Sequence, residues 1–321
     1  MEERPDLFQR KNRVRIIGLV ILATVNYIVA AAAAGAAIGL VIVFWILSEA
    51  GDFSDLFDLT TIVVVLIGIG VIVLIAAVIG TFVALFRLPT QRRRLEQRVL
   101  AETRATVAQP GEHQQVQNII EALSIAAGIA VPRFAMIDDR APNSFGVGTK
   151  PENTIIGITS GLQELLTRDE LEAIIAYEVS RVRSLDVALS SWTVALTGTA
   201  IESLDDGGLA SIIGFIPLRL ARRLQVWALR GSGPERDRVA VQFTRNPESL
   251  VDALDKLHTD PSQILRVSRA TAPLWIEVPT PAGATSNSER KLVAELGLDG
   301  RITELRALAG LPPAPTPAAS S

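Results

Sequence analysis

The chain has 321 residues, of which 49% are hydrophobic and only 5% aromatic, so it can hold a membrane module and one globular domain. Its net charge of -3 argues against a nucleic-acid partner, which would need a basic surface. Without cysteine it can form neither disulfides nor thiolate metal sites, and its two histidines, His113 and His258, belong to no recognisable ligand pair.

Two uncharged apolar runs come first in the chain, at residues 16–47 and 61–86. Each is long enough to cross a bilayer as a helix, which takes about 20 residues. Neither has the polar face of a core helix in a soluble protein, and the first is too long for the apolar part of a cleaved signal peptide. We therefore predict that residues 1–87 form a transmembrane hairpin whose partner is the lipid bilayer.

The charges that flank the two runs predict how the hairpin is oriented. The connecting loop "SEAGDFSDLFDLT" is acidic and contains no lysine or arginine, whereas basic residues precede the first run and follow the second. These residues are Arg4, Arg10, Lys11, Arg13 and Arg15, then Arg87, Arg92, Arg93, Arg94 and Arg98. Because basic flanks stay in the cytoplasm, we expect a multi-pass protein of the inner or plasma membrane with both its N-terminus and its downstream domain cytoplasmic.

The remaining residues divide into a charged helical connector at 88–117, a domain at 118–310 and a disordered, proline-rich tail at 311–321. The domain begins with helical and strand patterns whose ends are marked by Pro132, the Lys150-Pro151 turn and a capping box of Thr167 and Glu170. Helices are expected at 116–129, 167–184, 237–244, after Pro247 and at 300–310, and strands at 133–139 and within 141–161. The apolar stretches 187–201 and 209–218 are too short to span a membrane, and we interpret them as core or membrane-surface helices that could also dip into the bilayer. This order predicts a mainly helical α+β domain with a small β-sheet.

The helix at 167–184 contains the segment "IIAYEVSRVRSLD", which places a carboxylate on its apolar face. On a helical wheel, Glu178 falls near the middle of an apolar arc, with Tyr177 and Arg181 together at the edge of that arc. A carboxylate in such a position is costly unless it has a partner. Glu178 is therefore either a rim residue paired with Arg181, three positions on, or a glutamate inherited from a catalytic site.

Three features stand in a fixed order around this helix: an Asn-x-Phe strand at Asn143, an R-D-E-L-E helix start at Arg168, and Asp186 beyond the helix end. In this order, and after a transmembrane hairpin, they resemble the HtpX-like integral-membrane zinc metallopeptidases, relatives of the CAAX prenyl proteases. The similarity covers residues 131–186 and resumes at 237–257. It implies a zincin-like metallopeptidase domain with Glu178 at the position of the general base and with Asp186 and Asp237 as supporting residues.

The chain departs from the family pattern at the implied zinc ligands. The two histidines of the H-E-x-x-H motif fall on Tyr177 and Arg181, and the third ligand, a glutamate four residues before Asp237, falls on Gly233. Glu235 lies two residues out of register and would substitute only if the local helix were shifted. A catalytic zinc takes about three protein ligands, whereas tyrosine is a rare ligand, arginine stays protonated and glycine has no side chain. We therefore expect no cofactor and a vestigial Glu178, with Arg181 paired to Glu178, Asp237 or both.

Three functions remain open from the sequence. The first is a membrane-anchored pseudopeptidase that binds peptides or partner proteins in membrane-protein quality control, or that acts as a scaffold or regulator of an active relative. The resemblance implies a peptide groove along Asn143, Phe145 and Gly146, where an extended peptide would add to an edge strand that Gly146 and Gly148 keep accessible. The alternatives are an active zinc metalloendopeptidase with an atypical metal site and a purely structural membrane protein.

Overall fold

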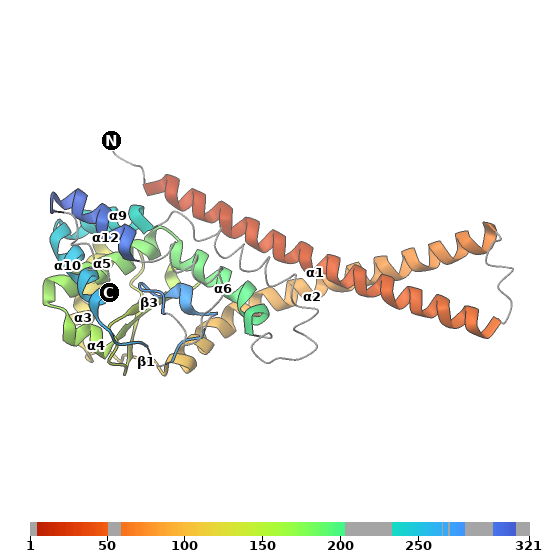
Figure 1. Cartoon of the computed structure of the whole chain (residues 1–321), viewed down its shortest axis with the longest axis horizontal. Coiled ribbons are helices and arrows are strands. Elements are labelled where there is room, and N and C mark those ends of the chain that lie inside the picture. Colours follow the sequence, from red (N-terminus) through yellow and green to blue (C-terminus); the bar gives the residue numbers. More distant parts are fainter. Residues whose placement is uncertain are drawn as a thin grey trace, which may run out of the picture. The chain divides into compact units, whose positions relative to one another are not determined.

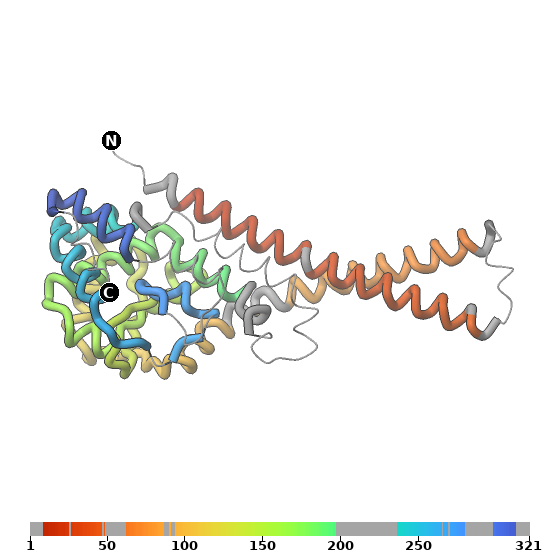
Figure 2. Tube along the Cα trace, in the orientation of Figure 1, coloured from red at the N-terminus to blue at the C-terminus, as the bar shows by residue number. Residues whose placement is uncertain are grey.

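The structure, a computed structural model, describes residues 5–50, 59–202, 233–264, 266–268, 270–279 and 298–312. The chain divides into two compact units, residues 17–91 and residues 1–16 together with 92–321. The path of the main chain is drawn in Figures 1 and 2. The two units are described one after the other.

Two long helices, α1 (Pro5–Ala50) and α2 (Leu59–Thr103), form the smaller unit. The first residues of α1, up to residue 16, and the last residues of α2, from residue 92, belong to the larger unit. Each contains a candidate membrane span, Gln9–Ile46 in α1 and Ile62–Phe86 in α2, and very little of either is buried inside the protein. The helices pack closely through small residues, since a Cβ atom at Gly35 would lie 2.7 Å from Ala76 and one at Gly80 equally close to Ala31. The two predicted apolar helices are thus present as candidate membrane spans, whereas the multi-pass topology and the cytoplasmic orientation stay predictions.

The larger unit contains a four-stranded sheet with the order β1-β2-β4-β3. The strands are β1 (Thr106–Val107), β2 (Arg133–Ile137), β3 (Ser144–Val147) and β4 (Ile155–Thr159). β2 and β4 are parallel, whereas β3 and β4 form an antiparallel hairpin closed by a 3-10 turn, η2 (Pro151–Asn153). The predicted strand pair around Lys150-Pro151 is therefore correct, and β3 is the last strand at one end of the sheet.

Helices make up most of the remainder of this unit. They are α3 (Gln114–Ala127), α4 (Ser160–Leu165), α5 (Arg168–Arg183), α6 (Asp186–Glu202), α9 (Gly233–Thr244), α10 (Pro247–Thr259) and α12 (Leu298–Ala309), with a short 3-10 helix η3 (Ala272–Leu274). α5 contacts α3, α9 and α10 and lies among them in Figure 1. Its N-terminus has the predicted capping box of Thr167 and Glu170. α3 ends at Gly128, which adopts the left-handed conformation with φ of 67°, four residues before Pro132.

The sheet lies between two hydrophobic clusters because its strands are apolar on both faces. On one face Phe134, Ile156 and Ile158 pack with residues of α3 and α5. On the other face the strands pack with α6 and with the segment that contains Leu274 and Trp275. Apart from half-buried Glu172, α5 is buried from Glu170 to Val182, which places the polar residues of this part inside the core.

The predicted fold class, a mainly helical α+β domain that follows a membrane hairpin, is confirmed. The apolar stretch 187–201 forms most of α6, whose described first half is buried as a core helix would be. The stretch 209–218 lies outside the described residues, as does the predicted tail beyond Pro312.

Candidate functional site

Glu178 lies in the middle of α5 and is completely buried. Its Oε1 accepts a hydrogen bond from the Ser144 hydroxyl of β3 at 2.7 Å. Its Oε2 accepts one from Nη1 of Arg181, one turn further along α5, at 2.9 Å. The buried carboxylate predicted from the helical wheel is therefore present, and both of its oxygens are engaged by the chain's own donors.

Arg181 is 1% exposed and connects three parts of the chain. Besides bonding Glu178, its Nε donates to Oδ2 of Asp186 at 3.1 Å and its Nη1 donates to the backbone carbonyl of Leu274 at 3.1 Å. Burial alone would lower the pKa of the guanidinium, but the carboxylates of Glu178 and Asp186 outweigh it and raise that pKa. Arg181 is thus a permanent buried cation at the second histidine position of the motif.

Arg236 of α9 and Tyr177 of α5 also belong to this network. Nη2 of Arg236 lies 2.8 Å from Oδ1 of Asp186, and its Nη1 donates to the Tyr177 hydroxyl at 3.3 Å. The Tyr177 ring is buried, with the guanidinium carbon of Arg301 4.4 Å from its centroid. The guanidinium carbon of Arg181 lies 5.8 Å from the same centroid, so Tyr177, at the first histidine position, interacts with three arginines.

Asp237 pairs with a different arginine from the one expected. Nε and Nη2 of Arg301, in α12, donate to its two carboxylate oxygens at 3.0 and 2.7 Å, which is a bidentate pair. Both residues are buried, and Asp237 raises the pKa of Arg301 against the lowering effect of burial. The expectation that Arg181 pairs with Glu178 is correct, but its second carboxylate is Asp186, because Arg301 occupies Asp237.

The residues expected to line an open peptide groove are buried instead. Asn143 Oδ1 accepts from the backbone N–H groups of Ser144 and Glu277, at 2.9 and 3.3 Å, and its Nδ2 donates to the Glu277 carbonyl at 2.8 Å. Phe145 is in edge contact with Trp275, 5.1 Å between ring centroids. At Gly146 a Cβ atom would lie 2.7 Å from Val187 of α6 and 3.2 Å from Oε2 of Glu178, so this glycine allows close packing. The backbone that we expected to be accessible is covered by the chain itself.

The residues present do not fit a zinc ion. Within the described ranges no group of three His, Cys, Asp or Glu residues could hold a metal. His113, at the N-cap position of α3, is in edge contact with Phe134, and His258, in the last turn of α10, contacts Asp299. Gly233 is the first residue of α9, and the side chain of Glu235 lies outside the described part of the chain. A guanidinium that cannot lose its proton lies where a ligand to a cation would be needed.

Three members of this network were not identified from the sequence: Ser144, Arg236 and Arg301. Arg301 had a recognisable signal in the sequence. Together with Leu298, Ile302 and Leu305 it follows the i, i+3, i+4, i+7 spacing of one helix face, so it falls on the apolar face of α12. This is the pattern that identified Glu178. Ser144 and Arg236 have no comparable signal, because they directly adjoin Asn143 and Asp237 and follow no periodic pattern.

Comparisons with known proteins agree with this assignment of the fold. The profile of Peptidase family M48 matches residues 110–277, just over half of the chain. Two similar proteins, both named "Protease HtpX homolog", come from Dictyoglomus turgidum and Streptococcus gordonii. The first is 34% identical over 195 residues, which are 54% of this chain and 64% of the relative. The second is 31% identical over 237 residues, 66% of this chain and 78% of the relative. The match thus spans less than two thirds of the Dictyoglomus protein. Because the family profile covers more than half of the chain, the chain is an HtpX-like member of the membrane metallopeptidase family M48.

Proposed function

We propose that this chain is a membrane-anchored, non-catalytic member of its family, which binds peptides or partner proteins without cleaving them. The observation that carries the proposal is the buried ion pair of Arg181 with Glu178 and Asp186. It neutralises the carboxylate at the general-base position with a cation that belongs to the protein. All three residues are at most 1% exposed, so these interactions are shielded from water and salt.

Peptide hydrolysis at neutral pH requires an activated water and a base that can take its proton. In this family's chemistry a bound metal ion supplies the activation. Here both oxygens of Glu178 already accept hydrogen bonds, one from Ser144 and one from Arg181, so the chain's own donors engage the carboxylate. Arg181 would also repel an incoming cation. These features favour a binding role over a hydrolytic one.

The membrane hairpin and the family resemblance support the cell membrane as the place of action. We propose that the larger unit faces the cytoplasm and that its partners are membrane proteins, presented as extended segments, or an active relative. A role in membrane-protein quality control, or as a scaffold, follows from such partners.

Hydrolysis of an unfolded protein tests the proposal directly. The full chain, purified in detergent micelles and supplied with zinc, is incubated with casein beside a matched Glu178→Gln variant. We expect the two proteins to give equal, background cleavage. Cleavage by the unaltered chain that disappears in Glu178→Gln would overturn the proposal, because a residue with no catalytic role cannot affect the rate in this way.

A further inference from the structure

Residues 270–279, which we call the strap, lie along the outer edge of β3, where they appear in blue in Figure 1. β3 is the last strand in the sheet order, so this edge can accept one more strand. Trp275 forms an antiparallel bridge with Phe145, and the Ile276 N–H donates to the Ser144 carbonyl at 2.9 Å. The chain has therefore added its own segment to the edge of its sheet.

Side chains of the site hold the strap at both ends of this pairing. Asn143 bonds the N–H and the carbonyl of Glu277, and Arg181 donates to the carbonyl of Leu274. The same guanidinium that neutralises Glu178 thus binds a backbone carbonyl of an extended segment. None of these contacts depends on which side chain the segment carries at the bonded position, so a foreign extended peptide could form all of them.

The strap also fills an apolar site beside Phe145, which we call the seat. Leu274, Trp275 and Ile276 are between 0% and 3% exposed, and the Trp275 ring packs on Phe145. A segment that replaced the strap would need large apolar side chains at three successive positions to bury the same surface. Segments of this kind are common in membrane proteins that have not yet folded.

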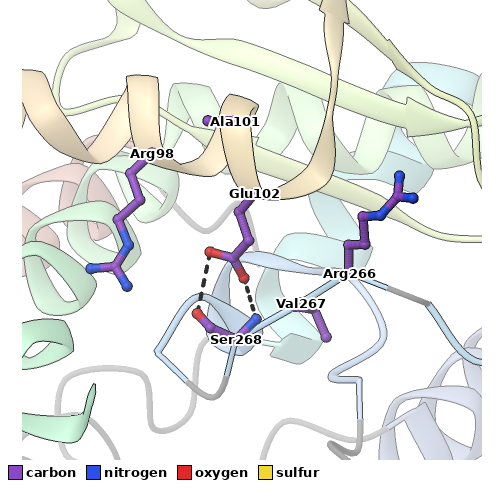
Figure 3. A pocket seen from close by; sticks show the side chains of 6 residues that line it. All are labelled: Arg98, Ala101, Glu102, Arg266, Val267 and Ser268. Carbon is purple, nitrogen blue, oxygen red and sulfur yellow. Dashed lines mark hydrogen bonds between the residues drawn. The ribbon is translucent and has the colours of Figure 1, made fainter. Parts of the chain in front are cut away.

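A single carboxylate holds the start of the strap and the residue that comes shortly before it. Glu102, near the end of α2, accepts hydrogen bonds from the backbone N–H and the hydroxyl of Ser268 (Figure 3). It also accepts one from the Thr271 hydroxyl at 3.0 Å. The fastening lies in an open groove of about 560 Å³. This groove is lined by Arg98, Ala101, Glu102, Arg266, Val267 and Ser268. Water therefore reaches the point at which the strap is attached.

The seated strap leaves one polar group unsatisfied. Nε1 of Trp275 is buried and has no hydrogen-bond partner in the part of the chain that the structure describes. A buried N–H without an acceptor costs free energy, and this cost is removed when the strap leaves its seat. The seat is thus occupied by a segment that does not fit it perfectly, as expected of an occupant that can be displaced.

We propose that the strap is a built-in occupant of a peptide-binding edge, and that an extended apolar segment of another protein binds along β3 only when the strap has left. This inference deepens the proposed function and rests on it for the premise that the bound segment is not cleaved. The strap is then a regulator of binding, since whatever weakens its attachment exposes the edge.

Peptide binding to the full chain in detergent micelles tests the proposal. The probe is a fluorescent peptide with the sequence of residues 271–279, TAPLWIEVP, beside a scrambled peptide. Ile276→Pro removes the N–H that bonds Ser144, and Trp275 already has the extended ψ of 152° that a following proline requires. Ile276→Ala is its matched control, because it loses a similar side chain but keeps the N–H.

We expect Ile276→Pro to bind the peptide at least about tenfold more tightly than Ile276→Ala, with no binding of the scrambled peptide. Glu102→Ala, which releases the strap's attachment far from the seat, should likewise bind more tightly than Gln97→Ala on the same helix. Equal affinities within both matched pairs, or no binding by any variant, would overturn the proposal.

Hydrogen exchange of the unaltered chain covers the case in which the variants fail to fold. The strap's amides should exchange faster than those of β4, because the strap opens on its own. Exchange as slow as that of β4 would contradict the proposal. If the peptide binds and is then cleaved, the non-catalytic function fails while the strap inference stands, so the two outcomes are distinguishable.

Discussion

Among single residues, Arg181 has the largest structural role because it is a buried charge with partners on three elements. Removing one member of a buried ion pair leaves the other charge without compensation, which costs about 3–5 kcal/mol. We predict that Arg181→Met lowers the free energy of unfolding by this amount, measured as a lower thermal midpoint by circular dichroism in micelles. An unchanged midpoint would show that the network does not stabilise the fold.

A double variant isolates the pair itself. Glu178→Gln added to Arg181→Met removes the uncompensated carboxylate, so the double variant should be less destabilised than the sum of the two single variants. For groups in direct contact this coupling is about 0.5–3 kcal/mol. Additive effects would mean that Arg181 acts mainly through Asp186 and the Leu274 carbonyl.

Glu277, in the strap, titrates in an unusual range. Burial raises its pKa to about 7, helped by Asp260 and Asp299, while His258 opposes the shift. Because the folded-state pKa lies above the ordinary value of 4.5, Glu277 stabilises the fold below about pH 4.5 and this contribution is lost as the pH rises through 7. We predict a fall in unfolding free energy between these pH values that is smaller in Glu277→Gln. Parallel pH profiles of the two proteins would refute this assignment.

Sequence reasoning at the residue scale succeeded where a charged residue interrupts an apolar helical face, as Glu178 does. It could not identify Arg236 or the carbonyl of Leu274 as partners, because both come from parts of the chain far from α5. Side chains that meet across a tertiary contact leave no periodic signal in one sequence. For the same reason the sequence did not identify Arg301 as the partner of Asp237.

At the scale of elements, the β3–β4 hairpin depends on a glycine under an aromatic ring. Phe145 pairs with Gly157 across the hairpin, and a Cβ atom at Gly157 would overlap the Phe145 ring. We predict that Gly157→Ala destabilises the protein by about 1–3 kcal/mol, because the ring and the strap behind it must move. Chemical denaturation measures the effect.

Gly300→Ala is the matched control for this substitution. Gly300 is exposed in the first turn of α12, and outside its own helix backbone no atom of the described residues lies within 4 Å of the added methyl group. The control should be neutral or more stable by up to about 1 kcal/mol, since alanine favours helix. A similar loss in both variants would exclude a specific effect of the ring.

The regular elements of the larger unit could be predicted because each has a local signal, such as the capping box of α5 or the turn before β4. The position of the strap could not be predicted in this way. Its sequence reads as an apolar run between prolines, and nothing local indicates that it pairs with β3, more than 120 residues earlier. The edge that we expected to be accessible is therefore covered by the strap, although the strand that forms it was placed correctly.

For the whole molecule, the arrangement across the membrane remains a prediction from the basic flanks. The absence of native cysteine makes labelling at single introduced cysteines unambiguous. Ser48→Cys, near the end of α1, should react with an impermeant maleimide in intact cells, whereas Ser262→Cys should react only after permeabilisation. The reverse labelling pattern would place the larger unit outside the cytoplasm.

The central claim concerns the whole site, in which arginines and carboxylates satisfy one another where relatives of the family bind zinc. The most direct measurement is the zinc content of the purified full chain by mass spectrometry, after exposure to zinc and dialysis. Tyr177→His combined with Arg181→His is the matched control, because it restores two ligands of the type that zinc prefers. We predict far less than one zinc per unaltered chain and more in the control, whereas one tightly bound zinc per unaltered chain would contradict the account.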